Sequence, residues 1–154
     1  MSEAQDNQQQ FAIQKIYLKD VSFESPNAPA IFGHEQWQPE VNVQLNTEAK
    51  SVSENIHEVT LTVTVTAKQQ EKTAFLVEVK QAGIFQLAGF EKEQMGGMLG
   101  AYCPEVLFPF AREAIADLVT KGGFPQMLLS PVNFNAMYMQ HQQQQAAQAA
   151  ETAH

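Results

Sequence analysis

The fold of this chain is decided by the stretch Val59-Thr60-Leu61-Thr62-Val63-Thr64-Val65-Thr66. Apolar and threonine side chains alternate along it without a break. Since successive side chains of a β-strand point to opposite faces, this pattern predicts a strand with one apolar face and one face in water. The chain therefore contains at least one sheet with a solvated face.

The residues on both sides of this stretch extend the sheet. After a polar turn at residues 68–72, apolar side chains alternate again at residues 75–79, and apolar character continues to Leu87. This predicts a hairpin with the preceding strand. Earlier in the chain, residues 41–45 alternate Val and Leu with Asn and Gln, which predicts another strand with one wet face.

The first predicted strand covers residues 11–24. Its apolar face is expected to carry Phe11, Ile13, Tyr17, Val21 and Phe23. The alternation is interrupted in the middle, which predicts a bulge or bend near Ile16. Two prolines in residues 25–29 end the strand because they remove backbone donors and fix φ. A crossing loop that carries Phe32 and Trp37 follows.

The last third of the chain changes to a helical period. Apolar residues recur at helical spacing from Val106 to Leu118, and Gly122-Gly123 follows where a helix ends. Pro109 predicts that this helix either starts near the proline or bends there.

A second helix is predicted from Ser130 as its N-cap and Pro131 at its first position. One stripe of this helix would carry Phe134, Met137, Tyr138 and His141. Four strands followed by two helices predict an α+β fold.

Composition limits the possible functions. A chain of 154 residues is one domain by default. Its 17 acidic and 9 basic residues give a formal charge of −8, which repels nucleic acid and anionic membrane surfaces. Residues 20–58 hold seven acids against Lys50 alone: Asp20, Glu24, Glu35, Glu40, Glu48, Glu54 and Glu58. This half is expected either to face a basic partner or only to keep the protein soluble.

The termini and the single cysteine indicate a cytoplasmic protein. Cys103 has no partner for an intramolecular disulfide, which favours a reducing compartment. Residues 1–10 are polar, lack the features of a signal peptide and are expected to be disordered. No apolar run reaches the roughly 20 residues that span a bilayer. Residues 11–140 would form the domain, and the Gln/Ala-rich residues 141–154 a disordered or marginally helical tail.

No catalytic or metal-binding motif stands out. The four histidines lack the spacing of metal ligands, and Cys103 is most simply a buried, inert thiol. The segment Gly96-Gly97-Met98-Leu99-Gly100 lacks the spacing of a dinucleotide loop, so its glycines are expected to allow close packing or a tight bend. Residues 95–99 could pack within the chain, between subunits or against a ligand. We expect no enzymatic activity, metal or cofactor.

Aromatic residues and methionines are more frequent outside the predicted strands than loops require. They either cap the edge of the sheet or form an adaptable apolar groove for extended peptide. These residues are Phe32, Trp37, Phe124, Met127, Phe134, Met137 and Tyr138.

Over about residues 11–145 the sequence resembles the SecB protein-export chaperones. The resemblance is carried by several separated segments, which include Phe11-Ala12-Ile13-Gln14-Lys15-Ile16-Tyr17, Gly83-Ile84-Phe85, Gly100-Ala101-Tyr102-Cys103-Pro104, Phe108-Pro109-Phe110-Ala111-Arg112-Glu113 and Ser130-Pro131-Val132-Asn133-Phe134. It implies four-stranded antiparallel sheets that assemble as a dimer of dimers. It also implies an ATP-independent holdase that binds unfolded preproteins and passes them to the SecA translocase ATPase.

The resemblance also implies two sites. The positions that match the SecA contact are Asp20, Glu24, Leu76 and Glu78, and their partner would be a short, basic, zinc-bearing tail of SecA. The positions that match the client groove are Phe32, Trp37, Phe124, Met127, Met137 and Tyr138, with Val41, Val43 and Leu45 as an extension. Two alternatives remain: a general holdase or toxin-system chaperone on the same fold, and a small-molecule site in the same groove.

Overall fold

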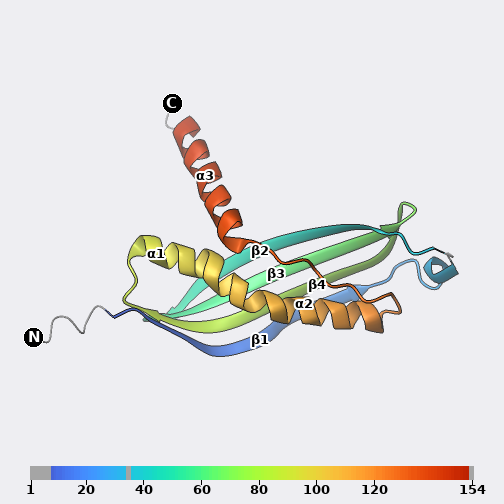
Figure 1. The fold of residues 1–154 in the computed structure, drawn as a ribbon, viewed down its shortest axis with the longest axis horizontal. Helices are drawn as coiled ribbons and strands as arrows, with labels where there is room; N and C mark the ends of the chain where they lie inside the picture. The colour runs from blue at the N-terminus through green and yellow to red at the C-terminus, as the bar shows by residue number, and fades with distance from the viewer. Residues whose placement is uncertain (1–7, 34–35, 153–154) are drawn as a thin grey trace, which may run out of the picture.

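The computed structural model describes residues 8–33 and 36–152. The predictions for His34, Glu35 and His154, and most of the segment predicted to be disordered at residues 1–10, lie outside this part of the chain. Four antiparallel strands form one sheet in the order β1-β4-β3-β2. The helices that cover it follow the strands in sequence (Figure 1). The predicted α+β fold is confirmed.

The predicted hairpin forms the centre of the sheet. It consists of β3 (Ile56–Gln69) and β4 (Lys72–Ala88). The apolar side chains of residues 59–65 are fully buried, whereas the threonines between them lie on the other face and are mostly half-buried. At the turn, Gln70 and Glu71 have φ of 51° and 67°, the left-handed pair that matches the twist of a two-residue hairpin.

The two remaining strands form the edges of the sheet. They are β1 (Gln10–Glu24) and β2 (Glu40–Ser53). β1 pairs with β4 through two register shifts, one just after Ile13 and one just after Leu18. Each shift turns the following side chains to the opposite face. The predicted bend near Ile16 is therefore confirmed, with one irregularity on each side of it.

The two shifts correct one prediction about β1. Ile16 pairs with Gly83 and Leu18 with Gln81, so both side chains lie on the apolar face of the sheet. Tyr17 was predicted on that face, but it lies on the polar face, where its hydroxyl donates a hydrogen bond to Glu58. A strict two-residue alternation could not predict this change of face.

The main helix is longer than predicted. α1 (Lys92–Gly97), the π-helical turn η2 (Met98–Tyr102) and α2 (Cys103–Lys121) follow one another directly. A start near Pro109 is therefore wrong. The proline costs about 3 kcal/mol inside a helix, but its neighbours Leu107, Phe108 and Ala111 are buried, and burying such side chains yields about 1.5–3 kcal/mol for each large one.

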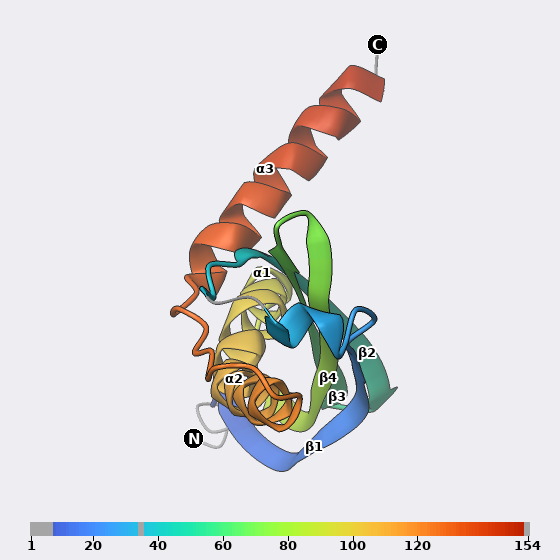
Figure 2. The ribbon, with the colours of Figure 1, turned by 90° about the vertical axis from the view of Figure 1, so that its right-hand side faces the viewer.

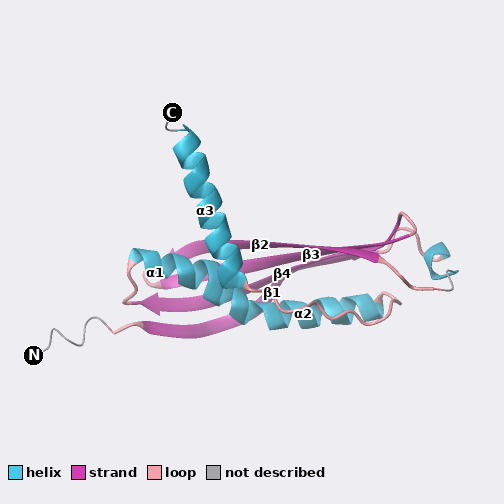
Figure 3. Cartoon of the chain, turned by 45° about the horizontal axis from the view of Figure 1, so that its top comes forward, coloured by secondary structure: helices cyan, strands magenta, loops and turns pink. Residues whose placement is uncertain are grey.

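The helices α1 and α2 lie over one face of the sheet, and the strands form the other layer (Figures 2 and 3). The core lies between these layers. Its largest fully buried members from α2 are Leu107, Ile115 and Val119. Met95, Met98 and Leu99 are partly buried against the same core, so the segment at residues 95–99 packs within the chain.

The last helix, α3 (Phe134–Thr152), begins later than predicted. Ser130 and Pro131 do not start it. Asn133 does, because its Oδ1 accepts a hydrogen bond from the Ala136 N–H at 2.9 Å, and asparagine is a preferred N-cap.

α3 rises away from the sheet (Figure 1), and every residue from Met139 to Thr152 is exposed. The division into a domain at residues 11–140 and a tail at 141–154 stays a prediction. Among the described residues, no helix combines the length and the hydropathy that a membrane span requires.

Candidate functional site

An aromatic cluster closes one end of the molecule. The crossing loop with the short helix η1 (Ala30–Gly33) brings Phe32 to the start of the loop that follows α2. There the ring centroid of Phe124 lies 5.1 Å from Phe32, 5.3 Å from Trp37 and 5.0 Å from Phe75. The three predicted residues Phe32, Trp37 and Phe124 are thus brought together, although Phe124 is buried and supports the other two.

A cavity of about 470 Å³ lies between β2 and the loop that joins α2 to α3. Val41 and Val43 of the edge strand are 45 % and 41 % exposed and line it. Met127 lines the opposite side together with the loop residues that follow it. Residues 128–132 were not predicted to belong to this wall, although the apolar pair Leu128-Leu129 in a short loop was a usable signal.

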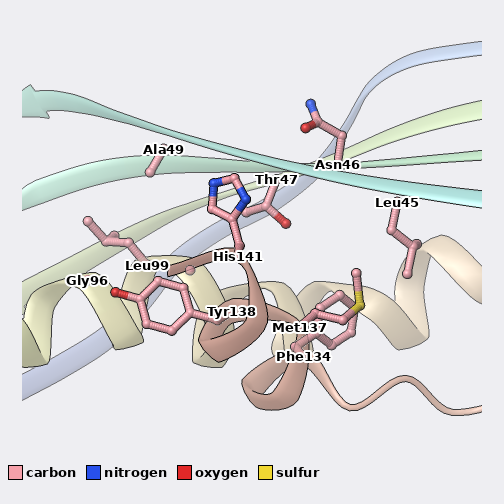
Figure 4. Close-up of a pocket in the computed structure, with 11 residues that line it drawn as sticks. Leu45, Asn46, Thr47, Ala49, Gly96, Leu99, Phe134, Met137, Tyr138 and His141 are labelled. Atoms are coloured by element: carbon pink, nitrogen blue, oxygen red, sulfur yellow. The ribbon is translucent and has the colours of Figure 1, made fainter. Parts of the chain in front are cut away.

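A second cavity of about 390 Å³ lies between β2 and the first turns of α3. Met137, Tyr138 and His141 of α3 face Leu45, Thr47 and Ala49 of β2, and Gly96 and Leu99 lie beside Tyr138 (Figure 4). The predicted helical stripe is therefore confirmed. Leu45 lines both cavities, so they adjoin along one strand.

All nine residues predicted for the groove lie either in the aromatic cluster or in the two cavities beside β2. They are Phe32, Trp37, Val41, Val43, Leu45, Phe124, Met127, Met137 and Tyr138. We call this set the apolar groove. Neither cavity is lined by Asp, Glu, Lys or Arg. The groove thus offers apolar contacts and the edge of a strand, but no acid–base pair.

The predicted acidic residues lie together on the opposite face of the sheet. In the pairing of β1 with β4, Glu24 is opposite Leu76, Ser22 is opposite Glu78, and Asp20 is opposite Lys80. Thr64 of β3 donates a hydrogen bond to Oε1 of Glu78 at 2.9 Å, which fixes that carboxylate. We call Asp20, Glu24, Leu76 and Glu78 the acidic face.

A paired carboxylate stands near the acidic face. Lys19 Nζ lies 2.8 Å from Oε1 of Glu58, and Tyr17 donates a hydrogen bond to Oε2. The hydrogen bond from Lys19, followed by that from Tyr17, lowers the pKa of Glu58. Burial, reinforced by Glu58, raises the pKa of Tyr17 to about 12. Glu58 is thus neutralised by Lys19, whereas the carboxylates of the acidic face make no ion pair within the described residues.

The single cysteine lies in the core. Cys103 is fully buried, as predicted, and burial raises the pKa of its thiol to about 12, which favours the protonated thiol over the reactive thiolate. Within residues 8–33 and 36–152, no three His, Cys, Asp or Glu side chains are grouped so that they could hold a metal ion.

Comparisons with known proteins agree with this geometry. The family described as preprotein translocase subunit SecB matches residues 4–145. A protein-export protein SecB from Nitrosococcus oceani is 62 % identical over 152 residues, which cover 97 % of this chain and 93 % of that protein. A protein-export protein SecB from Methylococcus capsulatus is 56 % identical over 151 residues, 98 % of this chain and 96 % of that protein.

The fold also matches a solved structure. A SecB-like chaperone from Mycobacterium tuberculosis, in complex with a ChAD peptide from an antitoxin, superposes with a TM-score of 0.65. The alignment covers 79 % of this chain and 90 % of that chain. Its sequence identity is 15 %, so this likeness concerns the fold alone.

Proposed function

This chain belongs to the SecB family, and from that premise we propose that it is an ATP-independent holdase of protein export. It binds unfolded preproteins in the cytoplasm, keeps them competent for translocation and delivers them to the SecA translocase ATPase. SecB is a chaperone family, so the chain acts by binding and release and not by catalysis.

The observation that carries this proposal is the apolar groove along an edge strand. Its walls combine exposed valines of β2 with Met127 and Met137, and methionine adapts to side chains of different shape. An extended chain can lie along such an edge and insert alternate side chains into the cavities. Binding of this kind requires exposed apolar segments, which unfolded preproteins offer and folded proteins do not.

We propose the acidic face as the contact for SecA. Its three carboxylates and Leu76 lie on two adjacent strands, with Glu24 directly opposite Leu76, which suits a short basic segment with one apolar contact. The zinc would belong to the SecA tail, and this chain needs no metal of its own.

We further propose that the chain assembles as a dimer of dimers. On the helix side of β1, Ile13, Leu18 and Val21 are 47 %, 52 % and 39 % exposed, and Phe110 on α2 is 48 % exposed. Large apolar side chains exposed on one side of the molecule are typical of a subunit interface. We call these four residues the β1 edge.

The two alternatives have weaker support. A general holdase or toxin-system chaperone would share the groove, but the likeness to the antitoxin-bound chaperone shows only the fold. Co-purification with SecA separates these two functions. A small-molecule enzyme would require converging charged groups, and the lining of the two cavities contains none.

The separation of the two sites is tested with Glu78→Lys. This variant places a positive charge on the acidic face, and we expect it to weaken binding of a basic SecA tail peptide by at least about tenfold at low salt, since like charges repel at close range. Affinity for a urea-unfolded preprotein should stay unchanged. Both are measured by fluorescence anisotropy.

Glu40→Lys is the matched control, because Glu40 lies on the same polar side of the sheet, in β2, but does not line the hollow that Glu78 lines. It introduces the same charge change and should reduce tail binding much less. If Glu78→Lys weakens client and tail binding alike, the two sites are not separate. If light scattering shows no complex between the wild-type protein and an unfolded preprotein, the proposed holdase function is wrong.

A further inference from the structure

Helix α3 contacts the rest of the chain through the side chains of its first turns. Phe134 is buried, and its ring meets that of Phe108 edge-on at a centroid distance of 5.7 Å. Tyr138 lies one turn further along, against α1 and η2 (Figure 4). Since residues beyond Tyr138 are exposed, these two rings determine how α3 stands relative to the sheet.

The ring of Tyr138 occupies the space that side chains at Gly96 and Gly100 would need. A Cβ atom on Gly100 would lie 2.5 Å from Cδ2 and 2.7 Å from Cε2 of that ring, and a Cβ atom on Gly96 would collide with its hydroxyl. At both glycines the nearest atoms belong to Tyr138. The hydroxyl is held in turn by Gln142, whose Nε2 donates to it at 2.6 Å.

The backbone does not explain these glycines. Positive φ occurs among the described glycines only at Gly89 and Gly123, so Gly96 and Gly100 have conformations that alanine adopts easily. Inside a helix, glycine is less favourable than alanine by about 1 kcal/mol. At the neighbouring Gly97, an added methyl group would meet no atom within 4 Å. At Gly96 and Gly100 it is the ring of Tyr138 that requires glycine.

We propose that Gly96 and Gly100 form a seat for Tyr138 that sets the width of the cavity between α3 and β2, and thereby the size of the client side chain that enters it. Both glycines and Tyr138 line this cavity, and Leu45 and Thr47 form its opposite wall. η2 lies behind the ring, so a ring lifted off its seat moves into the cavity. This inference rests on the proposed function, because it treats the cavity as a site for client side chains.

The test uses unstructured apolar peptides that differ only at one guest position, which is Ala, Leu, Phe or Trp. Dissociation constants are measured by fluorescence anisotropy for the wild-type protein and its variants. Gly100→Ala should narrow the cavity and weaken the Phe and Trp peptides roughly tenfold relative to the Ala peptide, a change of the size that one methylene makes in an apolar pocket. Tyr138→Leu should widen the cavity and shift the preference toward the larger guests.

Gly97→Ala is the control and should leave the preference unchanged, because the added methyl group meets open space. A purely structural defect would weaken all four peptides by the same factor, and that result for Gly100→Ala would overturn the inference. If Gly100→Ala fails to fold, Tyr138→Leu provides the test. A shift of its peptide preference toward larger guest residues supports the inference, and no shift or the opposite shift overturns it. If the wild-type protein binds none of the peptides, the proposed function fails and the seat for client side chains fails with it.

Discussion

The sheet has two edges, and both expose apolar side chains, but they differ in shape. Beside β2, two adjoining cavities of about 390 and 470 Å³ extend from α3 to the loop after α2. Val41 and Val43 line the larger cavity and are partly exposed. Along β1, Leu18 and Val21 are exposed on the helix side of the sheet, and Phe110 of α2 is exposed as well. Apolar exposure alone therefore does not distinguish the two edges; the shape of the surface does.

This difference suggests two kinds of partner. The β2 edge is hollow and has methionines in its walls, so it can accept side chains of many shapes with modest affinity. The β1 edge includes β-branched and aromatic side chains with few rotamers, which favour one complementary surface. A second copy of this chain is the partner that we propose for the β1 edge, and an unfolded preprotein is the partner for the apolar groove.

The largest effect is expected from Leu18→Glu on the β1 edge. An unpaired charge buried in an interface costs about 3–5 kcal/mol, which corresponds to a rise in the dissociation constant of more than about a hundredfold. Light scattering coupled to size exclusion should show smaller assemblies. Affinity for unfolded client per groove should change little. An unchanged molecular mass would show that this edge is not the subunit interface.

A smaller effect, restricted to client binding, is expected from Val43→Asp. The valine is 41 % exposed and lines the cavity beside Met127, so a carboxylate there should reduce client affinity by about 1.5–3 kcal/mol, the value of one buried aliphatic side chain. The molecular mass should stay the same.

Val52→Asp is its matched control, because Val52 is 56 % exposed on the same strand but lines neither cavity of the groove. Both changes place the same unfavourable residue in an edge strand, so the loss of strand propensity is shared. Equal losses of client affinity in the two variants would show that the groove is not where clients bind. Isothermal titration with an unfolded preprotein provides the measurement.

The smallest effect concerns the hydrogen bond between Tyr17 and Glu58 on the polar face of the sheet. Tyr17→Phe removes the hydrogen bond to Glu58 and should lower the free energy of unfolding by about 1 kcal/mol. In the wild-type protein the pKa of Tyr17 is raised from 10.0 to about 12. The stabilisation linked to this proton is complete below about pH 10 and is lost as the pH rises toward about 12.

The lowered pKa of Glu58 makes stability depend on pH in the opposite direction. Its contribution is present above its ordinary pKa of 4.5 and is lost as the pH falls below that value. Tyr17→Phe should therefore flatten the alkaline decline in stability, as followed by denaturant unfolding across the range of tyrosine titration, about pH 9 to about pH 12. It should also reduce the acid decline in part, because the hydrogen bond from Tyr17 is the second contribution to the lowered pKa of Glu58. Tyr102→Phe serves as the control. If the free energy of unfolding of both variants falls with rising pH as it does in the wild type, the hydrogen bond to Glu58 has no measurable role.

The strands were predictable because their alternation is strict, and the errors arise where backbone geometry interrupts it. The register shifts in β1 place Ile16 and Leu18, and not Tyr17, on the apolar face. The interrupted alternation indicates an irregularity near Ile16, but it does not give the number of shifts or their positions. The start of the main helix was missed because Lys92–Gly97 contains glycines in place of an apolar stripe. The start of α3 was misplaced because both Ser130 and Asn133 can cap a helix.

The sequence led to residues that line the two cavities, but not to the shape of the cavities. Aromatic residues and methionines at unusual positions, together with the family resemblance, pointed to nine residues, and their role in client binding stays a prediction. The loop wall at residues 128–132 and the contact of Tyr138 with the glycines depend on how α3 leaves the sheet. That direction follows from tertiary packing, which a local pattern does not contain.

The π-helical turn Met98–Tyr102 changes which face the long helix presents on its two sides. Its wider turn takes up about one extra residue, and one residue corresponds to about 100° of rotation in a helix. The helix before the turn presents Gly96 to Tyr138, while the helix after it presents Leu107 and Ile115 to the sheet. Deleting a single residue from this turn would restore one continuous phase, and the two surfaces would no longer each meet their own partner.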